Sequence, residues 1–184
     1  MSARSDASPS GATKLLVLGA TGGTGREVVS QALQQGHDVT VFVRSPQRLT
    51  VTHDGLRVLT GSVTDDGQAL AAAVRAQDVV ISTLGVGRSF NDVPVLPRTL
   101  MRLLLRDVYA DKAAGEDELR RSRLHWTLVY PVTLTNGPRT GRYRVGERLA
   151  LRGFPRISRA DVADFILTQT QSRMYVRKGM LIAY

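Results

Sequence analysis

The stretch Lys14–Glu27, KLLVLGATGGTGRE, decides the fold that the rest of the chain follows. It begins with four consecutive apolar residues, Leu15 to Leu18, as expected for a parallel strand that helices cover on both faces. A glycine-rich loop follows, and a helical pattern begins directly after it. This order of strand, loop and helix is the context in which a glycine-rich loop binds the phosphates of a dinucleotide.

The glycines of this loop have separate expected roles. Gly19 allows a tight turn, Gly22 lets a ligand approach the backbone, and Gly25 lets the helix pack closely on the strand. Thr24 is expected to cap the helix, whose free N–H groups and positive dipole end would face a phosphate. A strand–turn–helix without a ligand is the alternative, and the complete order of elements makes it the less favoured one.

Length and composition predict one globular domain with a full core, since the chain has 184 residues, of which 42% are hydrophobic and 22% charged. The absence of cysteine excludes disulfides, thiolate metal sites and cysteine nucleophiles. His37, His53 and His125 lack the spacing of metal ligands.

No apolar run is long enough to span a membrane. Residues 1–12 predict a disordered tail on a cytoplasmic protein, and residues 13–184 the domain.

The net charge of +9 lies wholly in the second half of the chain. Through Pro97, eight basic residues balance eight acidic ones, whereas from Arg98 onward there are seventeen against eight. A solvated arginine-rich surface is the favoured interpretation, and an anionic substrate is the next. Charge alone also admits a nucleic-acid partner, but the aromatic content is only 5% and no nucleic-acid-binding motif is present.

Strands and helices alternate after the loop. The expected helices are Glu27–Gln35 and Gln68–Arg75, and the expected strands are Asp38–Val43, Leu56–Leu59 and Asp78–Leu84. This alternation predicts an α/β fold with a doubly wound parallel sheet, of the NAD(P)-binding Rossmann-like class. In the second half we expect a helical region over Arg98–Ser122, strands at Trp126–Val129 and Met180–Ala183, and a helix over Arg159–Thr168 capped by Ser158.

The carboxyl ends of the predicted strands meet at the edge where such sheets bind ligands. The second strand is followed by Arg44 and Arg48 and by no acidic residue, which favours the 2′-phosphate of NADP over the free ribose of NAD. An ordinary surface cation is the alternative for Arg44. Ser62 and Val63 follow the third strand and suit the adenine. The fourth strand ends in Ser82-Thr83-Leu84-Gly85, on the nicotinamide side.

Four segments together carry a family resemblance: GATGGTG, VRSPQR, ISTLG and SRADVADFIL. From about Lys14 to Thr170 the chain resembles the atypical short-chain dehydrogenases of the NmrA-like, flavin reductase/biliverdin-IX beta reductase-like group. The resemblance implies NADPH binding and, in many members, reduction of flavins or other small conjugated molecules; some members only sense the nucleotide. It places cofactor contacts at Gly19, Thr21, Gly22, Thr24, Arg44, Arg48, Ser62, Val63 and Gly85, to which we add the neighbouring Ala20, Gly23 and Leu84.

The departures from this family concern catalysis. Ser62 replaces an aspartate, Tyr130-Pro131-Val132 replaces Arg-Pro-Gly, and about one helix–strand unit is missing after Gly85. Tyr109 and Lys112 are too close to form the Tyr-x-x-x-Lys pair of short-chain dehydrogenases. Thr83, Tyr109 and Lys112 are therefore only weak catalytic candidates, and Lys112 can equally pair with Glu116. Two functions stay open: an NADPH-dependent reductase of a small acceptor, and a non-catalytic NADP(H)-binding regulator or shortened inactive member.

Overall fold

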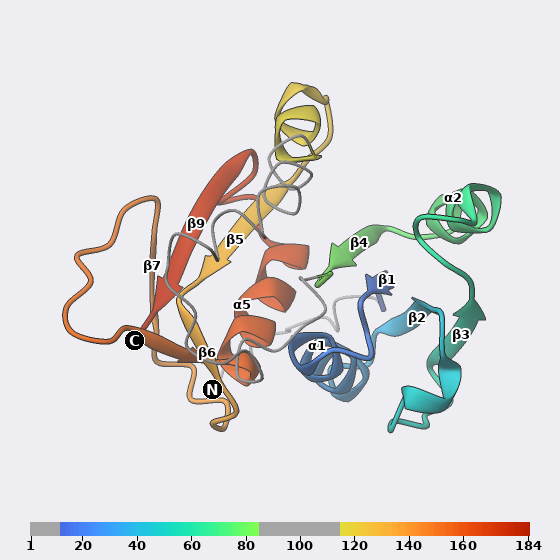
Figure 1. Ribbon diagram of the computed structural model, residues 1–184, viewed down its shortest axis with the longest axis horizontal. Helices are drawn as coiled ribbons and strands as arrows, with labels where there is room; N and C mark the ends of the chain where they lie inside the picture. Colours follow the sequence, from blue (N-terminus) through green and yellow to red (C-terminus); the bar gives the residue numbers. More distant parts are fainter. Residues whose placement is uncertain (1–11, 85–114) are drawn as a thin grey trace, which may run out of the picture. The chain divides into compact units, whose positions relative to one another are not determined.

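The computed structural model describes residues 12–84 and 115–184, which form two compact units, one ending at Thr83 and the other beginning at Leu84 (Figure 1). The predicted tail lies outside the described residues except for its last position. The predicted helical region from Arg98 is described only at its end, where residues 115–121 are helical.

The first unit is built on a four-stranded parallel sheet. Its strands are β1 (Lys14–Leu18), β2 (Asp38–Val43), β3 (Leu56–Thr60) and β4 (Val79–Ser82), in the order β3-β2-β1-β4. The first three agree with the predicted strands to within one residue, whereas β4 is shorter than predicted at both ends. The carboxyl ends of all four strands therefore lie at one edge of the sheet.

Two helices, α1 (Gly23–Gln34) and α2 (Gly67–Arg75), cover opposite faces of this sheet (Figure 1). On one face, Leu16, Leu18 and Phe42 pack with Ala73 of α2. The alternate residues of β1 and β2 point to the other face and are buried with the predicted apolar side of α1, namely Val28, Val29, Ala32 and Leu33. Gly36 follows α1 with a φ of 78°, as expected for a glycine that ends a helix.

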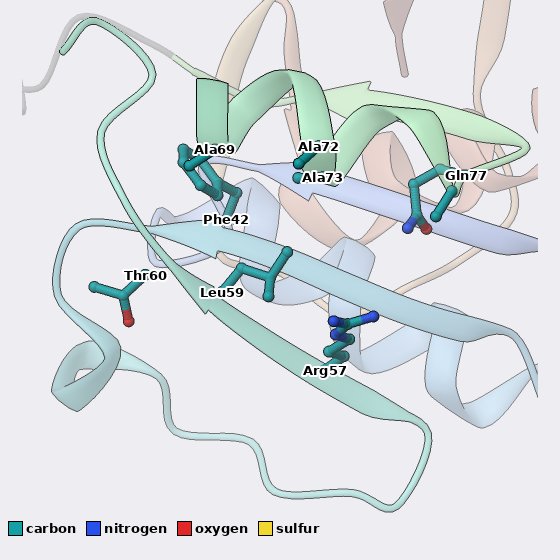
Figure 2. Close-up of a pocket in the computed structure, with 9 residues that line it drawn as sticks. Phe42, Arg57, Leu59, Thr60, Ala69, Ala72, Ala73 and Gln77 are labelled. Atoms are coloured by element: carbon teal, nitrogen blue, oxygen red, sulfur yellow. The ribbon is translucent and has the colours of Figure 1, made fainter. Parts of the chain in front are cut away.

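A pocket of about 270 Å³ lies between α2 and strands β2 and β3 (Figure 2). Four alanines of or next to α2 (Ala69, Ala72, Ala73 and Ala76) form one wall, since their side chains are too short to fill the space above Leu59. None of the residues predicted to bind the cofactor lines this pocket. It is a packing gap beside the sheet rather than the predicted ligand edge.

The second unit holds a three-stranded sheet and a two-stranded one. Its elements are β5 (Thr127–Pro131), β6 (Thr133–Thr135), β7 (Arg144–Gly146), β8 (Arg156–Ser158), α5 (Arg159–Gln171) and β9 (Lys178–Ala183). The larger sheet has the order β5-β9-β7, and β6 pairs with β8. Strand β7 runs antiparallel to β9, so pairing here is not wholly parallel as the alternation predicted. Phe165 of α5 anchors the core, with its ring 6.1 Å from that of Tyr143 and 5.8 Å from that of Tyr175.

The predicted loss of a helix–strand unit after Gly85 falls on residues 85–114, outside the described residues, and it stays a prediction. Within the described ranges, β4 pairs only with β1, and β5 pairs only with β9. Each of these two strands is therefore the edge strand of its own sheet. Over the same ranges, no helix is long and apolar enough to cross a membrane.

Candidate functional site

The glycine-rich loop turns sharply at the end of β1. Gly19 has a φ of 81°, which a residue with a side chain rarely adopts, and its carbonyl accepts a hydrogen bond of 2.9 Å from the Gly22 N–H. Gly22 and Gly23 are exposed, whereas Ala20 is fully buried and offers a ligand only its backbone. This is the tight turn, with an accessible backbone, that the sequence predicted.

Close packing of α1 on the sheet explains the third glycine. A Cβ on Gly25 would overlap the Gly19 carbonyl and would lie 2.8 Å from Thr83 Oγ1. Thr83 is held in turn by Leu18, whose carbonyl accepts hydrogen bonds from the Thr83 N–H at 2.9 Å and from its hydroxyl at 3.0 Å. The Thr83 hydroxyl proton is therefore used inside the fold, where it ties β4 to the start of the loop.

The N-terminus of α1 is open. The helix begins at Gly23 with Gly22 as N-cap, no side chain accepts a hydrogen bond from it, and no acidic residue lies in its first turn. Thr24 is thus the second residue of the helix, and its predicted role as the cap is wrong because the extended backbone of the N-cap occurs at Gly22. Uncapped N–H groups at a positive helix end are a ready site for a phosphate.

Arg44 lies at the same edge of the sheet, directly after β2. Its side chain is exposed, and it forms no ion pair with any residue in the described ranges. Arg48 ends a short 3-10 helix (Pro46–Arg48) and is also exposed. Both guanidinium groups are thus available to an anionic ligand.

The ladder between β2 and β3 brings the residues that follow β3 to the same edge as Arg44. Val43 pairs with Thr60, and the Gly61 N–H donates to the Val43 carbonyl at 3.0 Å, which extends the pairing by one residue. Gly61 must be small, since a Cβ there would overlap the Phe42 ring. Val63 packs its side chain against the core cluster of Leu16, Leu18, Phe42 and Ala73, and its backbone N–H donates to no residue in the described ranges.

Asp65 was not singled out from the sequence, but the structure places it at this edge. Its Oδ2 atom accepts hydrogen bonds from the hydroxyls of Ser62 at 2.6 Å and Thr64 at 2.9 Å. These two bonds, and then the charge of Arg44, hold the pKa of the Asp65 carboxyl below its usual value. The sequence shows the residue types of a turn over residues 62–65, but it does not show which of these side chains bond to one another.

In the second unit, Tyr130 occupies the position where the resembled family has an arginine. Its hydroxyl donates to Glu116 Oε2 at 2.6 Å and accepts from Arg120 at 3.3 Å. Burial and the Glu116 carboxylate raise the pKa of Tyr130. Arg120 also lies over the Trp126 ring, 5.5 Å from its centre. A guanidinium is therefore present beside β5, but it comes from the helical segment 115–121.

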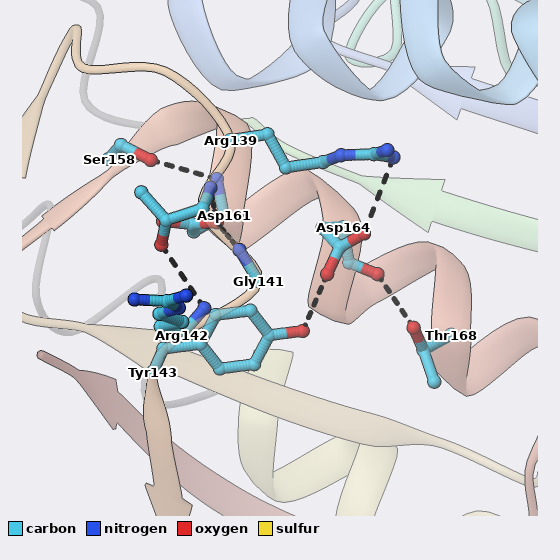
Figure 3. Close-up of polar contacts among 9 residues, drawn as sticks. Arg139, Gly141, Arg142, Tyr143, Ser158, Asp161, Asp164 and Thr168 are labelled. Atoms are coloured by element: carbon cyan, nitrogen blue, oxygen red, sulfur yellow. Dashed lines mark hydrogen bonds and ion pairs between the residues drawn. The ribbon is translucent and has the colours of Figure 1, made fainter.

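A buried carboxylate organises the start of α5 (Figure 3). Ser158 caps the helix by accepting a bond of 2.9 Å from the Asp161 N–H, as the sequence predicted. Asp161 is fully buried and accepts hydrogen bonds from the Thr140 N–H and hydroxyl, the Gly141 N–H and the Tyr184 hydroxyl, at 2.7 to 2.9 Å. This carboxylate has its oxygens occupied by the protein and serves the fold.

Of the remaining predicted site residues, two lie in the described ranges and three fall within residues 85–114. Thr21 is partly exposed in the glycine loop, and Leu84, 49% exposed, follows Thr83. Gly85, Tyr109 and Lys112 lie outside the described residues. Over the described ranges, no group of three His, Cys, Asp or Glu residues could hold a metal ion.

Comparison with curated proteins finds reductases. The chain is 32% identical over 135 residues to (4-alkanoyl-5-oxo-2,5-dihydrofuran-3-yl)methyl phosphate reductase of Streptomyces griseus, covering 65% of this chain and 47% of that protein. It is 35% identical over 94 residues to pinoresinol reductase 2 of Arabidopsis thaliana, covering 45% of this chain and 29% of that protein. The chain thus spans less than half the length of these relatives.

Solved structures share the fold over almost the whole chain. ChuY, an anaerobilin reductase from Escherichia coli O157:H7, has a TM-score of 0.73 at 24% identity, covering 92% of this chain and 96% of that one. An oxidoreductase from Lactococcus lactis has the same TM-score at 15% identity, covering 92% of this chain and 90% of that one. The likeness spans both units and confirms the predicted α/β, Rossmann-like fold class as one domain.

A family model described as NAD(P)H-binding matches residues 19–102 and 90–173 of the chain. The matched residues begin at the turn of the glycine loop and end just after α5. The predicted resemblance to the NmrA-like, flavin reductase-like group of atypical short-chain dehydrogenases is confirmed, and the chain belongs to the NAD(P)H-binding family.

Proposed function

We propose that this chain binds NADPH at the carboxyl edge of β1 to β4 and reduces a small conjugated acceptor. The observation that carries the proposal is the open, acid-free N-terminus of α1, which follows a turn whose backbone is exposed at Gly22 and Gly23. The N–H groups there would hold the pyrophosphate. Arg44 and Arg48 would bind the 2′-phosphate, which favours NADPH over NADH.

The order of strands sets the direction in which the dinucleotide would lie. With the pyrophosphate after β1 and the 2′-phosphate after β2, the adenine extends toward β3, where the Ser62 hydroxyl and the Val63 N–H would meet its edge. The nicotinamide half would then extend toward β4, near Thr83, Leu84 and Gly85. Thr83 would act there as a positioning residue, since its hydroxyl already donates to Leu18.

Hydride transfer from a nicotinamide requires few acid–base groups from the protein. When bound, the nicotinamide would supply a hydride, and the chain's own residues would position the acceptor and exclude water. A flavin or tetrapyrrole acceptor can take its proton from solvent. The relatives support reduction of varied small molecules, since their names specify a dihydrofuran phosphate, a pinoresinol and an anaerobilin. A phosphate-bearing acceptor would also suit the excess of arginine in the second half of the chain.

A non-catalytic NADP(H)-binding regulator is the second candidate. One observation favours it: the described part of the first unit has no tyrosine, its only lysine, Lys14, begins β1 at the opposite edge, and the Thr83 proton is committed to Leu18. The described residues of this unit thus offer neither a tyrosine nor a lysine as a proton donor at the nicotinamide side. A regulator would need the same binding edge but no acceptor site.

Turnover separates the two candidates. Purified chain would be mixed with NADPH and FMN, and with NADPH and biliverdin, while the nicotinamide absorbance is followed. Acceptor-dependent loss of NADPH supports the reductase. Tight NADPH binding without any consumption would support the regulator, and absence of NADPH binding would overturn both.

Substitution of Arg44 tests the cofactor preference. Arg44→Ala should weaken NADPH binding by roughly tenfold or more, because charge-assisted hydrogen bonds to the 2′-phosphate are lost. NADH lacks that phosphate, and its affinity should change little. Arg57→Ala is the matched control, since Arg57 is an exposed arginine near the opposite end of β3. If Arg44→Ala leaves the NADPH/NADH affinity ratio unchanged, our assignment of Arg44 is wrong.

A further inference from the structure

The hydroxyl groups of Ser62 and Thr64 share one acceptor. The Ser62 hydroxyl lies 2.6 Å from Asp65 Oδ2, the Thr64 hydroxyl lies 2.9 Å from the same atom, and the two hydroxyl oxygens are 3.0 Å apart. Each hydroxyl carries a single proton, and an ionised carboxylate can only accept. Charge-assisted bonds to a carboxylate are stronger than a bond between two hydroxyls, so both protons are directed to Asp65.

The consequence concerns the outward side of these hydroxyls. With its proton held by Asp65, the Ser62 oxygen offers only lone pairs to a ligand at the sheet edge. Rotation of the Ser62 side chain would break its 2.6 Å bond to Asp65. The backbone of this turn is held separately, because the Ser62 carbonyl accepts the Asp66 N–H at 3.0 Å. An isolated serine is both donor and acceptor, whereas this one is fixed as an acceptor.

We propose that Asp65 is a specificity-determining residue that fixes Ser62 as a hydrogen-bond acceptor and thereby selects a 6-amino purine over a 6-oxo purine. The inference rests on the proposed function, in which the base of the dinucleotide lies beside Ser62. The 6-amino group of adenine would donate to the Ser62 oxygen. The 6-oxo group of hypoxanthine would instead place a lone pair against a lone pair, and its protonated N1 would face the Val63 N–H, which donates to no residue in the described ranges.

Asp65 would thus take the place of the missing aspartate by acting through a neighbour. The resembled family has a carboxylate at position 62, where this chain has a hydroxyl. Here the carboxylate stands three residues later and sets the polarity of that hydroxyl. Asp65 is a positioning residue in this scheme, and it makes no contact with the ligand.

Two ligands that differ only in the purine base test the proposal. NADPH and its deamino form, in which hypoxanthine replaces adenine, carry the same charge, so any general electrostatic effect of a variant cancels in the ratio of their affinities. We expect native protein to prefer NADPH by roughly tenfold or more, the cost of an opposed and unsatisfied polar pair. Asp65→Ala frees the Ser62 proton, which can then turn toward an oxo group, and the preference should narrow severalfold.

Two further variants keep the test specific. Asp66→Ala removes the same charge one residue later, where the side chain caps no N–H of α2, and it should leave the preference unchanged. Ser62→Ala should narrow the preference as Asp65→Ala does. A Ser62→Ala protein with the native preference would show that Asp65 does not act through Ser62, and it would overturn the inference.

The measurements distinguish a failure of the proposed function from a failure of the role proposed for Asp65. If native protein binds neither dinucleotide, the proposed function is wrong. If native protein binds both equally, or if Asp65→Ala keeps the native preference, only the role of Asp65 is wrong. Affinities would be measured by the fluorescence of the bound reduced nicotinamide and by calorimetry, so that the result does not depend on turnover.

Discussion

The N-termini of α1 and α5 show two opposite uses of the same structural feature. Each helix begins directly after a parallel strand or a short loop and exposes N–H groups that the helix itself cannot satisfy. In α5, Ser158 caps the first turn and buried Asp161 ties the helix to residues 140 and 141 and to Tyr184. In α1, glycines stand where such side chains would be, and no side chain caps the turn.

The difference teaches how to distinguish a binding helix end from a structural one. Each helix begins within a segment that carries the family resemblance, GATGGTG for α1 and SRADVADFIL for α5. In SRADVADFIL, the Ser158 hydroxyl accepts a hydrogen bond from a free N–H group at the start of α5, and Asp161 supplies a negative charge in its first turn. The motif made of glycines leaves the positive helix end free, and a negative ligand is what that end lacks.

The largest expected effect is at the glycine that lets α1 approach the sheet. Gly25→Ala should destabilise the protein by about 3 kcal/mol or more, or prevent folding, because the added Cβ meets the Gly19 backbone, which cannot move aside. Denaturant unfolding measures this loss. Gly67→Ala in α2 is the control, since a Cβ there has nothing within 4 Å. Equal midpoints for native protein and Gly25→Ala would refute the close approach of α1.

The next substitution removes the carboxylate that accepts hydrogen bonds at the start of α5. Asp161→Asn should cost about 3 kcal/mol, since an amide cannot accept all the bonds that the carboxylate accepts and leaves buried donors unpaired. The exposed Asp117 provides the control substitution, Asp117→Asn, which should be nearly neutral. A loss below about 1 kcal/mol, the usual range for an exposed site, would mean that this carboxylate does not organise α5.

The same carboxylate should give a pH dependence. Burial acts to raise the pKa of Asp161, but hydrogen bonds from Gly141, Tyr184 and Thr140 outweigh it and lower the pKa in the folded protein. The group then contributes stability above the unfolded pKa of about 3.9, and this contribution is lost as the pH falls through the lower folded value. Native protein should therefore lose more stability between neutral and acidic pH than Asp161→Asn, and parallel curves would contradict this.

A third substitution adds a capping side chain to the uncapped N-terminus of α1. Gly22 has an ordinary extended backbone, with φ −78° and ψ 165°, so Gly22→Asp can adopt it and cap α1 as Ser158 caps α5. Unfolding should occur at the same or a higher denaturant concentration. NADPH affinity should fall roughly a hundredfold, because the carboxylate occupies the N–H groups and repels the pyrophosphate.

A smaller substitution separates charge from bulk at this position. Gly22→Ala adds a Cβ that would lie 3.3 Å from the Gly19 carbonyl, a tight but tolerable contact, and brings no charge. It should weaken binding less than Gly22→Asp does. If Gly22→Asp still binds NADPH with native affinity, the pyrophosphate does not lie at α1.

The first unit was predictable because its signals are local. The apolar run of β1, the apolar side of α1 and Gly36 at its end each depend on neighbours in the sequence, and the structure confirms them. The capping of α1 was predicted wrongly for a related reason: Thr24 is a good cap by residue type, but the extended N-cap backbone falls two residues earlier, at Gly22.

Contacts between distant segments were harder to predict. Asp161 was expected to be an acidic residue in the first turn of a helix, yet its partners come from residues about twenty positions earlier and from the C-terminal Tyr184. The Tyr130 hydroxyl likewise meets Glu116 of a preceding helical segment. Such partners depend on how the elements pack, which periodicity alone does not specify.

The smallest effect concerns the cap of α5 itself. Ser158→Ala should cost about 1 kcal/mol, the usual value of a helix cap, because it removes the acceptor of the Asp161 N–H and the donor to the Pro138 carbonyl. Ser45 is the matched control, since it also precedes a helical turn but its side chain caps nothing. Ser45→Ala should leave the free energy of unfolding unchanged.

Ser158→Ala should also leave NADPH affinity unchanged, and this result would complete the contrast between the two helix ends. At α5 a lost cap lowers stability and spares binding, whereas at α1 a gained cap spares stability and removes binding. A Ser158→Ala protein that binds NADPH more weakly at native stability would show that the α5 end also serves the ligand, and the division between the two would fail.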